Sequence, residues 1–288
     1  MSQNLPFYIV TSDATAHILP TVAYLYNKYW HRKEEQSFTI LGQSQLSVVL
    51  PNNFNFVSIR QKNDVRRWTR DIYQYIKHHE TSEYFILTLD DYLPNQALNE
   101  EVLERLLAYA RAHKKVGRIG LGWSPLAGFT EIEKTEKGTV YALLPQASYR
   151  LVCQTSVWNR EYFLKYFWHW WTPWQLELRG SWWAKHDGWE IIGAKNPLSF
   201  DWVEESALSG RWPGRINVLG MHPSDVEYCI EKGMLNPEQL QYGMWTESTP
   251  PAFLDFRNTF SMDILKERLD TVSFENISKH YGRIYNRA

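Results

Sequence analysis

The stretch Tyr84–Leu89 is an apolar run of strand length that ends abruptly in two adjacent carboxylates, Asp90 and Asp91. Tyr92 and Pro94 follow the acids. In open α/β sheets, ligands bind outside the carboxyl ends of the strands. Because the acids follow the strand directly, the sheet would hold them where a hard cation and a charged ligand can bind. The sequence therefore predicts a ligand site at the end of this strand.

Strand and helix patterns alternate through about residue 122, which predicts a largely parallel, doubly wound sheet. Strands are expected at 6–11, 37–41, 54–60, 84–89 and 116–121, and helices at 11–30, 65–79 and 99–112. Further on, strands at 140–144 and 150–154 precede a helix at 159–167, and the tail 262–285 is expected to be partly helical. We therefore expect an α/β fold, with a mostly parallel central sheet flanked by helices and a smaller antiparallel portion.

The balance of charge argues against a general nucleic-acid surface. The 288 residues contain 31 Lys and Arg against 32 Asp and Glu, a formal net charge of -1, although a local basic face stays possible. Two cysteines in unrelated contexts fit a reducing compartment. No signal peptide or long apolar segment is readable, so a cytoplasmic location is expected.

Aromatic residues are concentrated in the run 167–174, which contains four tryptophans. The run is too dense to be wholly buried. Because tryptophan combines a flat apolar face with a polar N–H group, such a surface suits a sugar ring. A core corner that carries a partner-binding patch is the alternative.

Taken in order, five motifs resemble those of nucleotide-sugar-dependent glycosyltransferases of the GT-A fold, nearest the family-2-like bacterial and phage enzymes. They are the strand turn 10–13, the DxD-like 89–92, the block 154–162, the block 173–178 and an Arg-Trp segment at 209–212. The resemblance implies one domain over 1–222, divided into a nucleotide-sugar-binding half (1–122) and an acceptor half (123–222). Residues 223–288 would be an extension packed on the same domain.

The resemblance also implies roles for individual residues. The donor side would be bound by Thr11, Asp13, Arg60, Asp90, Asp91 and Arg211, and the acceptor by Gln154, Trp158, Trp170, Trp171 and Trp174. Asp91, with Asp90 and a late His222, would hold Mn²⁺ or Mg²⁺. The pattern Asp-Asp-Tyr departs from a full DxD, so one carboxylate is expected to bind the cation and the other to orient ribose or sugar.

Glu177 is the expected general base. It lies between Leu176 and Leu178, and apolar neighbours disfavour a charged carboxylate and raise its basicity. Asp187 is the alternative base. Each candidate also has an ordinary structural interpretation: a cap for the acid pair, an exposed face for Glu177, a surface position for Arg211, and core packing for the tryptophans.

The function expected from this resemblance is transfer of a sugar from a nucleotide sugar, UDP-sugar first, to a hydroxyl of a polysaccharide or lipopolysaccharide-type glycan, with inversion. One alternative is glycosylation of another polymer such as modified phage DNA. Only two short basic segments, 66–67 and 113–115, support it. The other is a non-catalytic carbohydrate-binding protein. A glycosidase is disfavoured because no second carboxylate is evidently paired with Glu177.

Overall fold

The computed structural model describes residues 5–30, 36–44, 46–59, 64–113, 115–122, 128–135, 138–195, 202–203, 207–208, 215–217 and 221–241. Contacts divide the chain into two compact units, residues 1–204 and 205–288. In all the described ranges, every helix is too short or too polar to cross a lipid bilayer.

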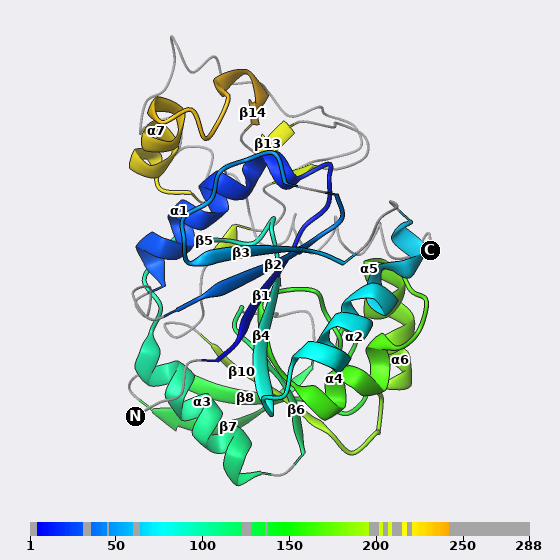
Figure 1. The fold of residues 1–288 in the computed structure, drawn as a ribbon. Coiled ribbons are helices and arrows are strands. Elements are labelled where there is room, and N and C mark those ends of the chain that lie inside the picture. Colours follow the sequence, from blue (N-terminus) through cyan, green and yellow to red (C-terminus); the bar gives the residue numbers. More distant parts are fainter. Residues whose placement is uncertain are drawn as a thin grey trace, which may run out of the picture. The chain divides into compact units, whose positions relative to one another are not determined.

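Unit one is built on a nine-stranded sheet with the order β3-β2-β1-β4-β9-β6-β10-β8-β7 (Figure 1). Its strands are β1 (Phe7–Val10), β2 (Phe38–Gly42), β3 (Phe54–Ser58), β4 (Tyr84–Leu89), β6 (Val116–Gly120), β7 (Phe129–Thr135), β8 (Gly138–Leu143), β9 (Ser156–Asn159) and β10 (Glu190–Lys195). Parallel pairing joins β1 to β2 and β4, β2 to β3, and β6 to β10. The expected mixed α/β fold with a mostly parallel sheet is confirmed.

Two antiparallel features interrupt the parallel order. β9 lies between β4 and β6 and runs against both, so β4 and β6 point the same way. At one edge, β8 runs against both β10 and β7. A short pair also forms between β5 (Leu93–Pro94), just after the acid pair, and β11 (Trp202–Val203).

The helices of unit one are η1 (Ala16–Ile18), α1 (Leu19–Tyr29), η2 (Val65–Arg67), α2 (Trp68–His79), α3 (Glu100–Ala112), α4 (Arg160–Phe167), α5 (Pro173–Gln175), η3 (Leu176–Gly180) and α6 (Ser181–Trp183). Several begin where the sequence places a capping residue. The side chain of Asp64 accepts from the backbone of η2, that of Asn99 from α3, and that of Asn159 from α4.

Helices α1 and α3 cover one face of the sheet. Phe7 of β1 meets Tyr26 of α1 edge-on, with ring centroids 5.2 Å apart. Phe7 is also in register with Ile86 of β4, and Tyr84 of the same strand donates a hydrogen bond to the carbonyl of Ala110 in α3. Because side chains two apart on a strand share a face, α1 and α3 lie on the same side.

Helices α2 and α4 cover the opposite face and lie side by side (Figure 1). Phe85, which points away from Tyr84 and Ile86, packs edge-on against Phe163 of α4 at 5.1 Å. Gly117 of β6 lies directly under the ring of Tyr162, where an added Cβ would come within 2.5 Å. Both faces of the strands are therefore buried, which explains why β4 is a continuous apolar run and not an alternating one.

Three details differ from the sequence predictions. Residues 150–154, predicted as a strand, form an irregular segment, because the backbone of Leu151 bonds to the side chain of Ser181 at 2.9 Å instead of to a neighbouring strand. The helix expected from residue 11 begins only at Ala16, after a hydrogen-bonded turn in which the amide of Ala16 donates to Ser12. The strands β7, β9 and β10 were not predicted. The predicted helical tail at 262–285 lies outside the described residues.

Unit two contains α7 (Pro223–Glu231), η4 (Pro237–Gln239) and a small sheet. The sheet has the order β12 (Ala207–Leu208), β13 (Arg215–Asn217) and β14 (Leu240–Gln241). The boundary that contacts define falls between residues 204 and 205, so His222 belongs to this second unit.

Candidate functional site

Asp90 and Thr11 meet where β4 and β1 end. The backbone amide of Asp90 donates to the carbonyl of Val10 at 3.0 Å, and the amide of Thr11 donates to Leu41 at 3.0 Å. The hydroxyl of Thr11 then donates to Oδ2 of Asp90. The backbone hydrogen bonds of the sheet therefore continue one residue beyond β1 and β4, and they bring two of the predicted donor-side residues together.

Burial raises the pKa of the Asp90 carboxyl. Asp90 is only 5% exposed. Removal from water disfavours the charged form and raises its pKa to about 6, although hydrogen bonds from Thr11 and Thr15 oppose the shift. A carboxyl whose pKa lies so close to neutral pH is typical of a functional site.

Asp13 ties the end of β1 to the end of β2. Its Oδ1 accepts from the amide of Ser44 at 2.9 Å, and its Oδ2 accepts from the Ser44 hydroxyl at 2.6 Å. Beside this pair lies a pocket of about 270 Å³. It is lined by Thr11, Asp13, Ala16, Gln43, Ser44, Leu46, Ser47 and Phe56. With an aromatic ring, small hydroxyls and an amide in its wall, the pocket suits a flat heterocycle such as a nucleobase.

Glu177 lies on η3, a single turn of π-helix. Its Oε1 accepts a hydrogen bond from the backbone amide of Cys153 at 2.8 Å, and the residue is half-buried. The turn packs tightly because Gly180 lies against Leu151, where an added Cβ would come within 2.8 Å. Isolated π-helical turns occur often at functional sites, where they redirect a side chain.

The carboxylates of Glu177 and Asp91, which lie on different elements, both act electrostatically on Cys153. The pKa of the Cys153 thiol is raised well above its ordinary value. Burial is the largest cause, followed by the carboxylate of Glu177 and then by that of Asp91. Both carboxylates therefore lie within electrostatic range of one side chain. The segment around Cys153 leads into β9, whose first residue Ser156 pairs with Leu87 near the carboxyl end of β4. The predicted base and the predicted cation ligand therefore belong to one edge of the sheet.

Gln154, a predicted acceptor-side residue, lies half-buried on this same segment. Next to it, the hydroxyls of Thr155 and Thr88 are 2.6 Å apart, which ties the segment to β4. Gln154 is thus placed along the chain between Cys153 and the start of β9.

Arg118 is a buried cation near this edge that the sequence predictions missed. Its Nη1 donates to the hydroxyl of Ser156 at 2.8 Å and its Nε to the carbonyl of Arg150 at 3.1 Å. Burial lowers its pKa to about 10, and the negative charge of Glu177 is among the groups that oppose the shift. The available signal was an arginine inside the apolar strand 116–121, since an arginine is rarely buried without partners.

Two predicted acceptor residues are core residues, which corrects the sequence prediction. Trp158 is fully buried and packs edge-on against the rings of Phe163 and Phe167, at 5.6 and 5.5 Å. Trp171 is 7% exposed and stacks on His169 at 4.1 Å. Neither indole presents a free face to an acceptor. Trp170 and Trp174, each 58% exposed, do.

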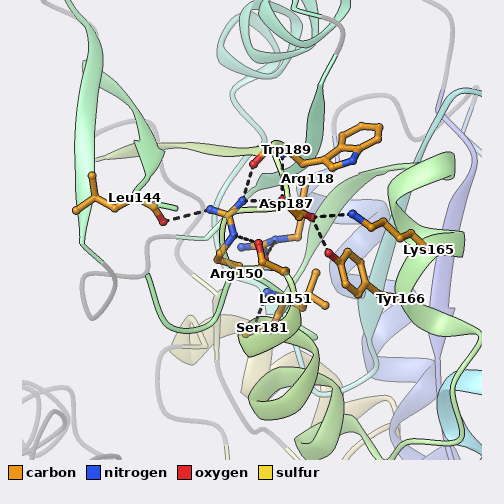
Figure 2. Close-up of polar contacts among 10 residues, drawn as sticks. Arg118, Leu144, Arg150, Leu151, Lys165, Tyr166, Ser181, Asp187 and Trp189 are labelled. Carbon is orange, nitrogen blue, oxygen red and sulfur yellow. Dashed lines mark hydrogen bonds and ion pairs between the residues drawn. The ribbon is translucent and has the colours of Figure 1, made fainter. Parts of the chain in front are cut away.

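Asp187, the predicted alternative base, belongs to a structural ion-pair cluster (Figure 2). It accepts from the hydroxyl of Tyr166 at 2.6 Å and from Lys165 at 3.3 Å, and lies 3.6 Å from the guanidinium of Arg150. Its side chain is 6% exposed. It also precedes β10, which is parallel to β6, and therefore lies toward the edge of the sheet opposite Asp90. Surrounding cations and a position away from the acid pair both disfavour a role as base.

Arg150 organises the rest of that cluster. Its Nε donates to Ala184 at 2.9 Å and its Nη1 to Leu144 at 3.2 Å, and its Nη2 donates to Trp189 at 2.5 Å (Figure 2). The guanidinium is therefore fully engaged by backbone carbonyls and by Asp187. The cluster ties the start of the segment that carries Cys153 to Ala184 at the end of α6.

For three further predicted site residues, the structure gives no contact with the candidate site. Arg60 and Arg211 lie outside the described residues. His222, in unit two, precedes α7, and its carbonyl accepts from the amides of Asp225 and Val226. Among the residues that the structure describes, no group of three or more His, Cys, Asp or Glu side chains could hold a metal ion.

Comparisons with known proteins give distant likenesses. No family model matches the chain, and no curated protein does. An apo UDP-glucose pyrophosphorylase is similar over 80% of this chain and 100% of its own, with 13% identity and a TM-score of 0.40. A UTP-bound UGPase from Acinetobacter baumannii is similar over 82% and 96%, with 9% identity and a TM-score of 0.45. A UDP-glucose pyrophosphorylase complexed with UDP-glucose is similar over 69% and 92%, with 12% identity and a TM-score of 0.37. Likenesses this distant do not identify a reaction, so the function is argued from the residues.

Proposed function

We propose that the chain is a GT-A-type glycosyltransferase that moves a sugar from a nucleotide sugar, UDP-sugar first, to a hydroxyl group of a glycan. The observation that carries the proposal is geometric: Thr11 bonds to the buried Asp90 where β4 ends, and Glu177 bonds to Cys153 on the segment that enters β9 at the same end of the sheet. Such a transfer needs a site for the diphosphate and a carboxylate base facing it, and these residues supply both.

The donor would lie across the ends of β1, β2 and β4. The nucleobase occupies the pocket beside Asp13 and Ser44, with Phe56 in its wall. Thr11, next to the pocket, bonds to Asp90, so the path from base to acid pair follows the sheet edge. Ribose then lies near Asp90, and the diphosphate lies near Asp91.

The acid pair suits a divalent cation that is bound together with the diphosphate of a nucleotide sugar. Mg²⁺ keeps several waters and is commonly held by one or two carboxylates together with substrate phosphates, so a two-acid donor set suffices. Asp91 would hold the cation, and Asp90, whose pKa is near 6, would share it or contact ribose. A bound cation would stabilise the negative charge that develops on the departing diphosphate.

Glu177 would act as the general base. It removes the proton from the acceptor hydroxyl as that oxygen forms its bond to the anomeric carbon, while the bond from this carbon to the diphosphate oxygen breaks. The base and the leaving group then lie on opposite sides of the sugar, which inverts the anomeric centre. The buried cation Arg118 lies within electrostatic range of Glu177.

Trp174 and Trp170 are the proposed acceptor contacts. Trp174 lies three residues before Glu177 in a continuous helical segment, so it is near the proposed base along the chain. Trp170 is equally exposed, but Arg67 already covers one face of its ring at 4.9 Å. Trp174 is therefore the first choice for stacking against a sugar.

The test is donor binding measured by thermal shift with UDP-, GDP- and dTDP-sugars, each with and without Mn²⁺. A bound donor raises the melting temperature by mass action. We expect Asp91→Asn to abolish the Mn²⁺-dependent part of the shift. Glu83→Gln is the matched control, because this exposed carboxylate lies at the other end of β4.

No shift with any nucleotide sugar would refute the donor site, and an equal loss in both variants would refute the role of Asp91. Binding without turnover of any acceptor would favour the non-catalytic alternative. Turnover with DNA but with no glycan would favour the alternative polymer.

A further inference from the structure

Five tryptophans between residues 168 and 183 are not used by the core. Their exposed fractions range from 49% to 68%, and they are Trp168, Trp170, Trp174, Trp182 and Trp183. If an indole side chain offers about 250 Å², the five leave about 700 Å² of aromatic surface in water. Exposed aromatic side chains that gather in one segment to this extent indicate a place where something binds.

Two of these side chains, Trp168 and Trp183, are linked through His169 to the core, and the exposed Trp182 is the chain neighbour of Trp183. Trp168 lies against His169 at 3.9 Å, and His169 meets Trp183 edge-on at 4.8 Å. His169 in turn stacks on Trp171, which is buried. We name Trp168, Trp182 and Trp183 the tryptophan face. Because Trp168 and Trp183 are anchored through His169 to Trp171, these two indoles are held rigidly and lose little entropy on binding.

Arginines lie near the tryptophan face. Arg179 is exposed and lies at the end of η3, three and four residues before Trp182 and Trp183. Arg70 donates to the carbonyl of Trp168 at 3.1 Å. Arg67 lies over Trp170, the neighbour of the face.

The local charge differs from that of the whole chain. Segments 64–71 and 165–185 contain six Lys and Arg and three Asp and Glu, whereas the whole chain is nearly balanced at -1. Three of the six cations lie in ion pairs, Arg66 with Asp64, Arg67 with Asp71 and Lys165 with Asp187, so the excess positive charge comes from Arg70, Arg179 and Lys185. The exposed charge beside the tryptophan face is therefore mainly positive.

We propose that the tryptophan face rests on an anionic lipid surface. Indoles prefer the headgroup level of a bilayer, where the ring meets apolar chains and the N–H meets water or headgroups. Interleaved arginines add attraction to anionic lipids, and binding strength grows with both contributions. The occupant indicated by this mixture of rigid indoles and exposed positive charge is a membrane, which would present an acceptor glycan next to Trp174.

This inference does not depend on the proposed sugar transfer, because vesicle binding is measured without any nucleotide sugar. The experiment is flotation of the full chain with phosphatidylcholine vesicles and with vesicles that also contain phosphatidylglycerol. We expect recovery with the anionic vesicles only, lost at high salt. Tryptophan fluorescence should shift to the blue in the same samples.

The Trp182→Ala/Trp183→Ala variant should partition at least tenfold more weakly into anionic vesicles. Arg179→Gln, which changes only an exposed side chain, should weaken partition severalfold and should reduce its salt dependence. Tyr228→Ala, an exposed aromatic in unit two, and Arg111→Gln, an exposed arginine on α3 across the sheet, are the matched controls.

Absence of binding to both kinds of vesicle would overturn the proposal, and so would binding that the face variants and the controls weaken equally. Self-association of the wild-type chain that the double variant abolishes, in the absence of vesicle binding, would assign the face to a second copy of the chain. Loss of turnover on a soluble glycan by the double variant, again without vesicle binding, would assign it to the acceptor.

Discussion

The ionised form of Asp90 costs the folded protein stability, and its replacement by asparagine should show that cost. The asparagine side chain would keep the shape of the carboxylate and an oxygen that accepts from Thr11. It would remove the charge that burial disfavours. We therefore expect Asp90→Asn to stabilise the protein at neutral pH while it weakens binding of a donor with its cation.

The magnitude follows from the pKa. Burial raises the pKa of Asp90 from 3.8 to about 6 in the folded chain. A difference of about two units corresponds to about 3 kcal/mol of unfolding free energy. Because the folded pKa is the higher one, this stability is fully present below about pH 4 and is lost as the pH rises through 6. The wild type therefore loses up to about 3 kcal/mol in that window, and the variant does not.

The assay is urea unfolding of the wild type and Asp90→Asn at pH 4.5 and pH 7.5. We expect the variant to be more stable by about 2 to 3 kcal/mol at pH 7.5, and by clearly less at pH 4.5. Glu83→Gln, an exposed carboxylate at the other end of β4, should behave like the wild type at both values.

Two results would refute this reasoning. One is a variant that is less stable than the wild type at pH 7.5, which would mean that hydrogen bonds to the charged carboxylate outweigh its burial. The other is a stability difference that is the same at both pH values, because a charge that titrates in this window must change its contribution across it. An unchanged affinity of the variant for nucleotide sugar would show that Asp90 does not contribute to donor binding.

Three other substitutions test the remaining parts of the site. Glu177→Gln should lower turnover by about 10² to 10⁴-fold and leave the donor-induced thermal shift unchanged. The control is Glu161→Gln, an exposed carboxylate on α4. Equal turnover in the two variants would refute the role of Glu177 as general base. Asp187→Asn should cost about 3 kcal/mol in urea unfolding, because the buried charge of Arg150 loses its carboxylate; wild-type stability would contradict the structural role. Gly180→Ala, whose Cβ would meet a side-chain carbon at 2.8 Å, should cost about 1 to 3 kcal/mol and slow turnover more than it weakens donor binding; full activity would show that the π-helical turn is not required.

The residues of the proposed donor side were accessible to sequence reasoning because their signals are local. A strand buried on both faces is an apolar run, and Tyr84–Leu89 is one. The acids follow it in the chain, so their place at the sheet edge needs no knowledge of distant contacts. Asn99 similarly predicts the start of α3, since its side chain caps the helix whatever the rest of the chain does.

The acceptor side could not be predicted in the same way, because distant contacts determine it. β9 is four residues long and lies between β4 and β6, which a pattern along the chain does not reveal. The π-helical turn depends on how Gly180 packs against Leu151. Composition cannot say which indoles are inside: Trp158 and Trp171 are core residues, whereas Trp170 and Trp174 are exposed.

The two halves of the site are held by different kinds of interaction, and this has a consequence for how they respond to mutation. Backbone bonds between parallel strands position Thr11 and Asp90, so only loss of the sheet displaces them. Glu177 instead bonds to the irregular segment at Cys153, next to the segment that the Arg150 cluster fixes. Damage to that cluster should therefore move the base relative to the acid pair while donor binding survives. If both carboxylates belong to one active site, such variants lose turnover before they lose affinity for the donor.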